Sequence, residues 1–242
     1  MRNQVRLMLA TLLGAAAWAG VSRVVTAMAD LSVFSVREVQ VRGLAYADES
    51  EVVALLGLTP DATVWGDTEA WAGRIERHPL LVSATVRRRV PGTLIVEVEE
   101  RRPVALATTP TLEPVDPTGV RLPVDPAETR LDLPVLASPD PVPGSRLLPR
   151  RGRTLAAEVG RLMSADTAFL QRVSEVAWLD DNTVRARWTE PAVDFLFDLG
   201  TPPQRIREGL VVLADALARD PGRQPSVVDL RYADQVVVRR NR

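Results

Sequence analysis

The segment from His78 to Ala107 (HPLLVSATVRRRVPGTLIVEVEERRPVALA) constrains the fold of this chain more than any other. Apolar and polar residues alternate in both of its halves, and a Pro-Gly pair separates the halves. This pattern predicts a β-hairpin with one apolar and one charged face. The apolar faces of the two strands coincide only if the loop has an odd number of residues. We therefore predict a three-residue loop over 91–93, with Val90 opposite Leu94.

The two faces of this hairpin differ in their expected roles. Val82, Ala84 and Val86 share the face that would meet a hydrophobic core. On the outer face Arg87 would lie opposite Glu97, and a solvated cross-strand pair of this kind is worth a few tenths to ~1 kcal/mol. The pair is therefore expected to fix the register of the strands rather than to stabilise them.

The residues before the hairpin predict the rest of a small α+β unit. Alternation over 34–43 predicts a strand. Asp48 is expected to cap a short helix, with Glu51 as its partner in a capping box. Asp67 would cap a second helix, which Pro79 would end. The residues expected to face the core are Val52, Leu55, Leu56, Trp71, Ile75 and Leu81. The unit would have the order β-α-α-β-β and cover residues 34–104.

The rest of the chain, 105–240, predicts a second domain of different character. Residues 105–150 are rich in proline, which indicates extended loops with short strands, one of them over 131–136. Amphipathic spacing predicts helices over 154–163 and 204–218. Further strands are predicted over 173–179, 183–188 and 193–198, and a last strand or strand pair over 227–239. We expect a mostly antiparallel sheet with about two helices, which makes the chain α+β.

The N-terminus contains the chain's only apolar stretch of membrane length. Arg2 and Arg6 precede it, and the span is completed only if Arg23 snorkels to the headgroups. Positive charge before the span favours a cytoplasmic N-terminus. We expect a cytoplasmic tail over 1–6 and a single transmembrane helix over 7–28. A cleavable signal peptide remains open, because 27–29 (Ala-Met-Ala) fits a cleavage site. In both cases the bulk of the chain leaves the cytoplasm.

Composition excludes several classes of function. The net charge is −1, so no overall basic field favours nucleic acid. The chain has no lysine and no cysteine, which removes P-loop lysines, Schiff-base lysines and thiolate nucleophiles or ligands. His78 is the single histidine, and it is expected at a helix end rather than at a metal or catalytic base position. We predict no enzyme activity, no cofactor, no metal and no small-molecule substrate.

Three polar clusters are candidate sites, but the pattern of each favours a structural role. Asp180 and Asp181, followed by Asn and Thr, are typical of a turn. Glu97, Glu99 and Glu100 are expected to have structural roles, with the first two on a solvated strand face. The arginine run 87–89 also fits a solvated face, with a partner-binding patch as the alternative.

Four segments together resemble one protein family. They are VREVQVRG (36–43), the hairpin region 78–105, VDPTGVRLP (115–123) followed by LPVL (133–136), and VVDLRYADQVVVR (227–239). Their order and spacing are similar to those of the bacterial cell-division family FtsQ, called DivIB in Gram-positive bacteria. In that family the first two segments form a POTRA domain and the last belongs to a C-terminal β-domain.

The resemblance implies a bitopic scaffold of the divisome in the inner membrane at the septum. Such a scaffold would recruit the coiled-coil proteins FtsB and FtsL, and through them the septal peptidoglycan synthase. The resemblance places the partner contact at the last strand, where a partner strand adds to the sheet, with Tyr232 as a hot spot. The implied partner-binding residues are Asp229, Leu230, Arg231, Tyr232, Asp234, Gln235, Val236 and Val237.

Alternatives remain at this point. Tyr232 could simply pack against the last helix. The family commonly has a glycine shortly after the DLRY motif, where this chain has Gln235, which leaves the local turn open. A POTRA-type assembly or secretion factor that binds extended polypeptide is the second functional hypothesis, although this chain has one such unit and no barrel-like strands. A secreted cell-wall enzyme is the third, and it lacks a catalytic constellation.

Overall fold

A computed structural model describes residues 32–108, 111–137 and 144–240. The predicted cytoplasmic tail and transmembrane helix, 1–6 and 7–28, lie outside the described residues. Within those residues, no helix has the length and apolar character needed to cross a bilayer. The chain divides into two compact units between Glu100 and Arg101. Residues 101–104, which the sequence analysis placed with the first domain, therefore lie in the second unit.

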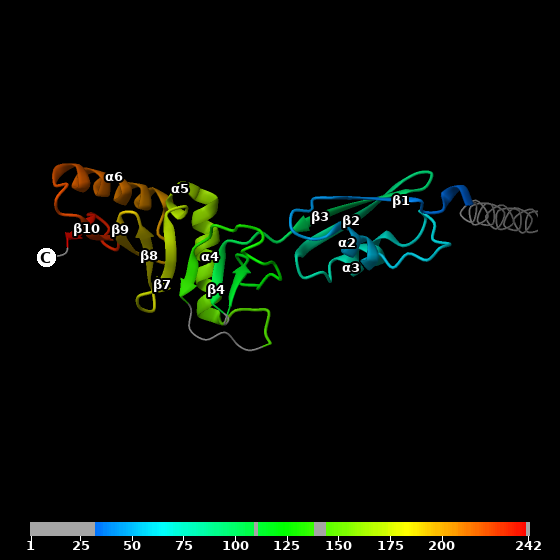
Figure 1. Cartoon of the computed structure of the whole chain (residues 1–242), viewed down its shortest axis with the longest axis horizontal. Helices are drawn as coiled ribbons and strands as arrows, with labels where there is room; N and C mark the ends of the chain where they lie inside the picture. The colour runs from blue at the N-terminus through cyan, green and yellow to red at the C-terminus, as the bar shows by residue number, and fades with distance from the viewer. Residues whose placement is uncertain (1–31, 109–110, 138–143, 241–242) are drawn as a thin grey trace, which may run out of the picture. The chain divides into compact units, whose positions relative to one another are not determined.

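The described residues of the first unit, 32–100, form a three-stranded sheet with two α-helices, and their order β-α-α-β-β is as predicted (Figure 1). After a short 3₁₀ turn, η1 (Ser32–Phe34), the elements are β1 (Glu38–Arg42), α2 (Glu49–Leu55), α3 (Thr68–Ile75), β2 (Leu81–Arg89) and β3 (Thr93–Glu100). The sheet order is β1-β3-β2, with β1 parallel and β2 antiparallel to β3. Val52, Trp71 and Ile75 of the helices, with Leu56 just after α2, pack on the strand residues Leu94 and Val96.

Both predicted helix caps are present, with one difference. Asp48 Oδ1 accepts a hydrogen bond from Ser50 N at 2.7 Å, and Asp67 Oδ1 accepts from the amides of residues 69 and 70, both at 3.0 Å. Glu51 does not act as a simple capping-box partner, because its Oε2 lies 3.3 Å from His78 Nε2. The second helix ends at Ile75, before the predicted stop at Pro79, and the next residues form the turn into β2.

The hairpin has the predicted odd loop but a different register. The loop is 90–92, so Arg89 pairs with Thr93 and Arg87 lies opposite Ile95. Arg87 Nη2 still reaches Glu97 Oε2 diagonally, at 3.2 Å. The cause is a tertiary contact: the carbonyl oxygen of residue 92 accepts hydrogen bonds from the first amides of the β1 region, 37 and 38. This contact fixes the tip one residue earlier than the strand pattern alone indicates.

A β-bulge overturns one predicted core position. The register shifts between Leu81 and Ser83, so Val82 turns to solvent while Leu81 is buried. The extra residue lets both Leu81 and Ala84 face the core, which strict alternation does not allow. Opposite the bulge, Glu100 is buried, and its carboxylate accepts hydrogen bonds from Tyr46 N at 2.8 Å and Ala47 N at 2.9 Å. This glutamate ties the end of β3 to the segment before α2.

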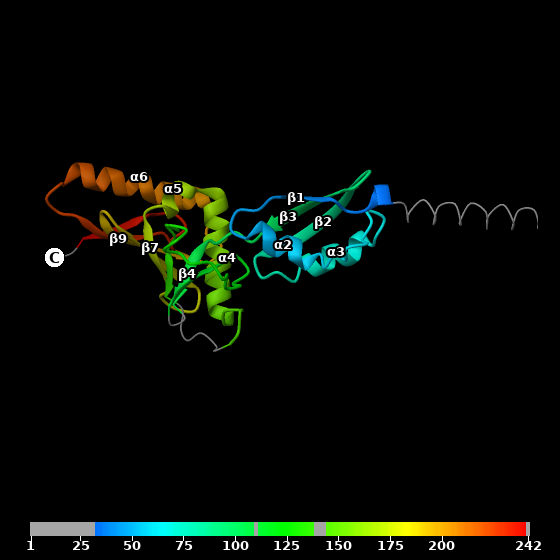
Figure 2. The same cartoon turned by 45° about the vertical axis from the view of Figure 1, so that its right-hand side comes forward.

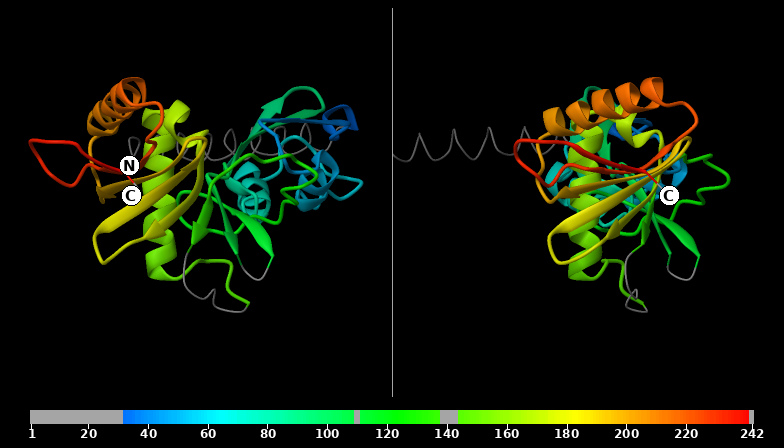
Figure 3. Two further views of the ribbon diagram at one scale, coloured as in Figure 1. Left: turned by 60° about the vertical axis from the view of Figure 1, so that its left-hand side comes forward. Right: turned by 90° about the vertical axis from the view of Figure 1, so that its left-hand side faces the viewer.

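In the second unit, the residues that the structure describes form an eight-stranded sheet with three helices (Figure 3). Its strands are β4 (Ala105–Thr108), β5 (Leu112–Val115), β6 (Val135–Ala137), β7 (Val173–Trp178), β8 (Thr183–Thr189), β9 (Ala192–Asp198), β10 (Pro225–Asp229) and β11 (Val237–Arg240). Its helices are α4 (Arg150–Ala165), the single turn α5 (Thr167–Leu170) and α6 (Pro203–Arg219). The strand order is β11-β10-β9-β8-β7-β6-β4-β5.

The sheet is mixed, whereas a mostly antiparallel sheet was expected. β4 and β6, β6 and β7, and β9 and β10 run parallel. A parallel neighbour requires a crossover connection, commonly a helix. Here α4 and α5 connect β6 to β7, and α6 connects β9 to β10. The core lies between the sheet and these helices and includes Leu155, Phe169, Phe195 and Ile206.

Candidate partner-binding edge at the C-terminus

The last two strands form one edge of the large sheet. β10 runs parallel to β9, and β11 pairs antiparallel with β10, with Val238 opposite Val228 and Val237 opposite Asp229. The predicted strand over 227–239 is thus a strand pair joined by the turn 230–236. In the part of the chain that the structure describes, no strand pairs with the outer side of β11. This edge offers backbone donors and acceptors to an added strand.

Asp229 supports this edge from the interior. Its side chain is fully buried, and its carboxylate accepts hydrogen bonds from Arg231 Nε at 2.8 Å, Arg231 Nη2 at 2.6 Å and Arg239 Nη2 at 2.9 Å. The Arg231 hydrogen bonds lower the pKa of Asp229 against the opposing effect of burial, and Asp229 in turn raises the pKa of Arg231. The three charges join the end of β10 to β11.

Leu230 also lies inside. It is buried against α6, where a Cβ on Gly209 would come within 2.7 Å of Leu230 Cδ2. A glycine at 209 therefore permits the close approach of the helix to the turn. Asp229 and Leu230 are buried and cannot touch a partner without moving. Of the predicted partner-binding residues, these two would therefore hold the edge in place rather than contact the partner.

Arg205 of α6 holds the turn itself. Its Nη2 donates to the carbonyl oxygens of Tyr232 at 2.5 Å and Gln235 at 2.7 Å, and its Nη1 pairs with Glu208 Oε2 at 2.7 Å. Gln235 has no positive φ, so the turn needs no glycine at this position.

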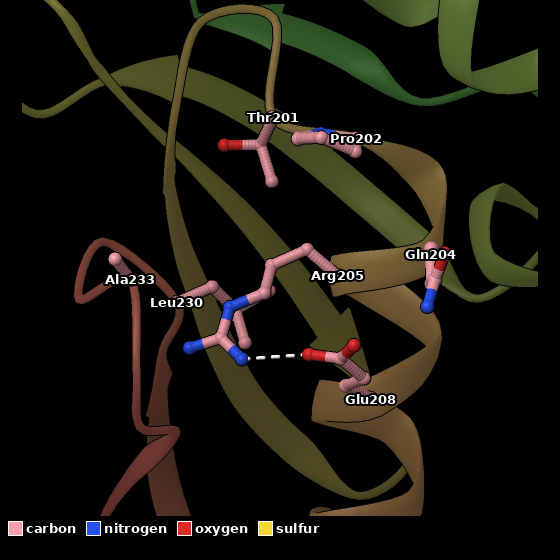
Figure 4. Close-up of a pocket in the computed structure, with 7 residues that line it drawn as sticks. All are labelled: Thr201, Pro202, Gln204, Arg205, Glu208, Leu230 and Ala233. Atoms are coloured by element: carbon pink, nitrogen blue, oxygen red, sulfur yellow. Dashed lines mark hydrogen bonds and ion pairs between the residues drawn. The ribbon is translucent and has the colours of Figure 1, made fainter.

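A cavity of about 390 Å³ lies between α6 and the turn (Figure 4). It is lined by Thr201, Pro202, Gln204, Arg205, Glu208, Leu230 and Ala233. Figure 4 shows the Arg205 side chain extending across it from the helix toward the strand side, with the ion pair to Glu208 drawn as a dashed line. The ion pair between Arg205 and Glu208 thus lines a cavity next to the turn that contains Tyr232.

The remaining predicted partner-binding residues differ in their exposure to solvent. Tyr232 is 45% exposed, so a large part of it is open to solvent. Asp234 and Gln235 are exposed. Arg231, Val236 and Val237 are partly buried. The exposed part of the site is therefore the turn from Tyr232 to Gln235 together with the outer side of β11.

The opposite edge of the same sheet is covered. β5 contains Pro114, which lacks an amide donor. The chain after β5 folds back on it, with a bridge between Val115 and Arg121 and a hydrogen bond from Leu122 N to the Pro114 carbonyl at 2.8 Å. The edge β2 of the first unit carries the bulge at Val82 and an arginine run, both of which discourage pairing. Of these three edges, β11 is the better template for strand addition.

The other polar clusters have structural partners. His78 bridges to Glu51, and Asp180 accepts from Asn182 N at 2.9 Å and Thr183 N at 2.8 Å, which confirms the predicted turn. These backbone hydrogen bonds lower the pKa of Asp180. Arg88 shares the core-side face of β2 and donates to the Val64 carbonyl at 2.8 Å. Among the described residues, no three His, Asp or Glu side chains gather as a metal site would require.

Sequence reasoning missed Arg205, Glu208 and Gly209. All three lie on α6, whose amphipathic pattern predicts a helix but not which of its residues meets the turn. A glycine inside an otherwise regular helix was the one available signal, because it indicates close packing. Nothing in the sequence pattern distinguishes Arg205 from the other surface arginines.

Comparison with known proteins agrees with this architecture. A sequence model described as POTRA domain, FtsQ-type, matches residues 34–101, so the first unit is a POTRA domain of this type. The chain is similar to the cell division protein FtsQ of Anaeromyxobacter sp. strain K, at 30% identity over 212 residues, which cover 82% of this chain and 71% of that protein. It is similar to FtsQ of Rhodothermus marinus, at 28% identity over 210 residues, covering 83% and 76%.

A third relative matches a shorter part of the chain. FtsQ of Mycolicibacterium smegmatis is 29% identical over 147 residues, covering 57% of this chain and 44% of that protein. The match to the Anaeromyxobacter protein is longer than either unit, so it extends into both. The chain belongs to the FtsQ family of cell-division proteins.

Proposed function

We propose that this protein is a bitopic scaffold of the divisome that recruits late division proteins to the septum. Residues 1–6 would be cytoplasmic, 7–28 would span the inner membrane, and both described units would lie outside the cytoplasm. FtsB and FtsL would be the direct partners, and the septal peptidoglycan synthase would be recruited through them. Membership of the family supports a role in cell division, and it favours this proposal over a POTRA-type secretion factor.

The observation that carries the proposal is the open edge of β11, together with an exposed tyrosine in the turn that leads into this strand. A partner strand that pairs with β11 would gain backbone hydrogen bonds, and its alternate side chains would reach Tyr232 and Val237. Tyrosine is a frequent hot-spot residue because it has a large rigid ring and a polar end. Asp229 and Arg205 would hold the strand pair and the turn in place before binding, which lowers the ordering cost of association.

A localisation experiment tests the cellular role. A fluorescent fusion of the full chain is expected to concentrate at midcell late in constriction. A fusion of residues 1–33 alone is the matched control, and it should stain the envelope evenly because it lacks both described units. Even envelope staining by the full chain in dividing cells would contradict the scaffold proposal.

A crosslinking experiment tests the edge. We expect p-benzoylphenylalanine at Val237 of β11 to crosslink in living cells to a small coiled-coil protein. The control places the same group at Leu112 of β5, which is exposed at the opposite edge of the same sheet. Mass spectrometry identifies the adducts. Equal adducts from both positions, or none from Val237 in cells where the fusion is at midcell, would reject β11 as the site.

A further inference from the structure

Three apolar side chains from separate segments are exposed at one end of the POTRA domain. They are Val33, Trp65 and Val90, each about half exposed. The segments are held side by side: Val64 N donates to the Phe34 carbonyl at 2.9 Å, and Arg37 N donates to the Gly92 carbonyl at 2.8 Å. Figures 1 and 2 show η1 and the β2–β3 turn at this same end of the unit. We call this surface the apolar end.

The apolar end is rigidly built. The rings of Phe34 and Trp65 meet edge to face, with centroids 5.7 Å apart. Arg37 Nη2 donates to the Val33 carbonyl at 3.1 Å, and Arg88 Nη2 donates to the Gly66 carbonyl at 2.9 Å. A Cβ on Gly92 would come within 2.7 Å of the Ser35 carbonyl oxygen, so the hairpin tip packs directly on the start of the chain. These contacts fix the backbone and leave the apolar side chains facing solvent.

Exposed apolar side chains that gather next to guanidinium groups suit the headgroup region of a bilayer. Tryptophan is enriched there because its ring is apolar and its N–H is polar. Arginine side chains at such a surface can reach phosphate oxygens while their apolar stems lie along the surface. Arg89, exposed beside Val90 at the hairpin tip, adds a guanidinium at the rim.

We propose that the apolar end rests in the phospholipid headgroup layer of the leaflet from which the predicted span emerges. This inference rests on the membrane anchor of the proposed function. Only residues 29–31 separate the span over 7–28 from Ser32, and this step covers at most ~14 Å. The headgroup region on each side of a bilayer is about 5–7 Å thick. The end of the domain that carries Val33 is therefore tethered within reach of that layer, and the membrane is its nearest apolar partner.

The same strand supplies a matched control position. Val82 and Val90 are both valines, 50% and 57% exposed, at opposite ends of β2. Eight residues of extended strand separate them by about 26 Å. If the apolar end meets the bilayer, only the position at 90 is covered by lipid.

The absence of cysteine from the sequence makes the test direct. Val90→Cys and Val82→Cys variants of the full chain would be labelled with the environment-sensitive fluorophore NBD. They would be reconstituted in vesicles of phosphatidylcholine and phosphatidylglycerol, with or without doxyl-labelled phospholipid. We expect the label at 90 to shift its emission to the blue, to lose most of its emission to the doxyl lipid and to resist aqueous iodide. The label at 82 should behave in the opposite way.

Three results would overturn the inference, and they differ in meaning. Equal iodide quenching of both labels in vesicle-bound protein would reject lipid contact while leaving the anchor intact. Shielding of the label at 90 without quenching by the doxyl lipid would assign the surface to a protein, either a second copy or a partner. Release of the whole chain by alkaline carbonate would reject the anchor itself and this inference with it. The crosslinking experiment from Val237 measures partner recruitment through β11 independently of these results.

Discussion

Replacing Tyr232 with alanine is expected to weaken binding of the coiled-coil partners by about 30-fold, the value that corresponds to a hot-spot loss of about 2 kcal/mol. Tyr232 is exposed in the turn that joins β10 to β11, and Arg205 holds the carbonyl oxygen of the same residue. The side chain is thus presented from a fixed backbone, so little binding energy is spent on ordering it. Because the ring is 45% exposed, its removal should change the stability of the fold by no more than about 0.5 kcal/mol.

Tyr46 is the matched control, since the chain has only two tyrosines. It is 36% exposed and lies in the POTRA domain, where its backbone amide donates to Glu100. Tyr46→Ala removes the same ring from another surface and should leave the dissociation constant unchanged. Affinities of the full-length variants in nanodiscs for the purified coiled-coil partners would measure both effects, with circular dichroism as the check on folding. Wild-type affinity of a folded Tyr232→Ala variant would exclude Tyr232 as a hot spot.

The sequence predicts those features of the fold that depend on local patterning. The alternation in the hairpin establishes its odd loop, and Asp48 and Asp67 mark the starts of both helices. The amphipathic spacing over 204–218 predicts α6 almost to its ends. In each case the signal and its structural consequence lie within a few residues of each other.

Features that depend on distant contacts were missed. The hairpin register is set by hydrogen bonds from β1 to Gly92, and the bulge at Val82 allows Glu100 to reach the backbone before α2. The parallel placement of β10 follows from the packing of α6 on the sheet. For the site, the resemblance to the family located the segment 229–237, but only the structure separates the buried Asp229 from the exposed turn.

Replacing Asp229 with alanine is expected to destabilise the C-terminal edge by about 1–3 kcal/mol, the usual cost of removing one partner from hydrogen bonds to charged groups. The change leaves Arg231 and Arg239 without the carboxylate that they share, at the junction of β10 and β11. Hydrogen exchange in the full chain would measure the effect as faster exchange of the β10 and β11 amides. Loss of this strand pair should also abolish partner crosslinking from Val237.

Asp181→Ala is the control for this change. Asp181 pairs with Arg151 at 2.7 Å, but its side chain is 99% exposed, and such pairs contribute about 0–1 kcal/mol. Exchange rates should therefore stay near those of the wild type. A similar small effect for Asp229→Ala would show that the two arginines find other partners and that the triad does not hold the edge.

The pH dependence gives a second, independent test of the same carboxylate. Hydrogen bonds from Arg231 lower the pKa of Asp229 in the folded state, so the unfolded chain takes up the proton first as the pH falls. The stabilisation is complete above the unfolded pKa of about 3.9 and is lost as the pH drops below it toward the folded value.

Asp48 and Asp180 also have lowered pKa values, so the wild type has other acid-sensitive groups. The informative quantity is the difference between the wild type and Asp229→Asn. That difference should be large at pH 7 and shrink below pH ~4, because the wild type then also loses the charge that binds β11 to β10. A difference that stayed constant down to the acid limit would mean that shape and hydrogen bonding at residue 229, rather than its charge, hold the edge.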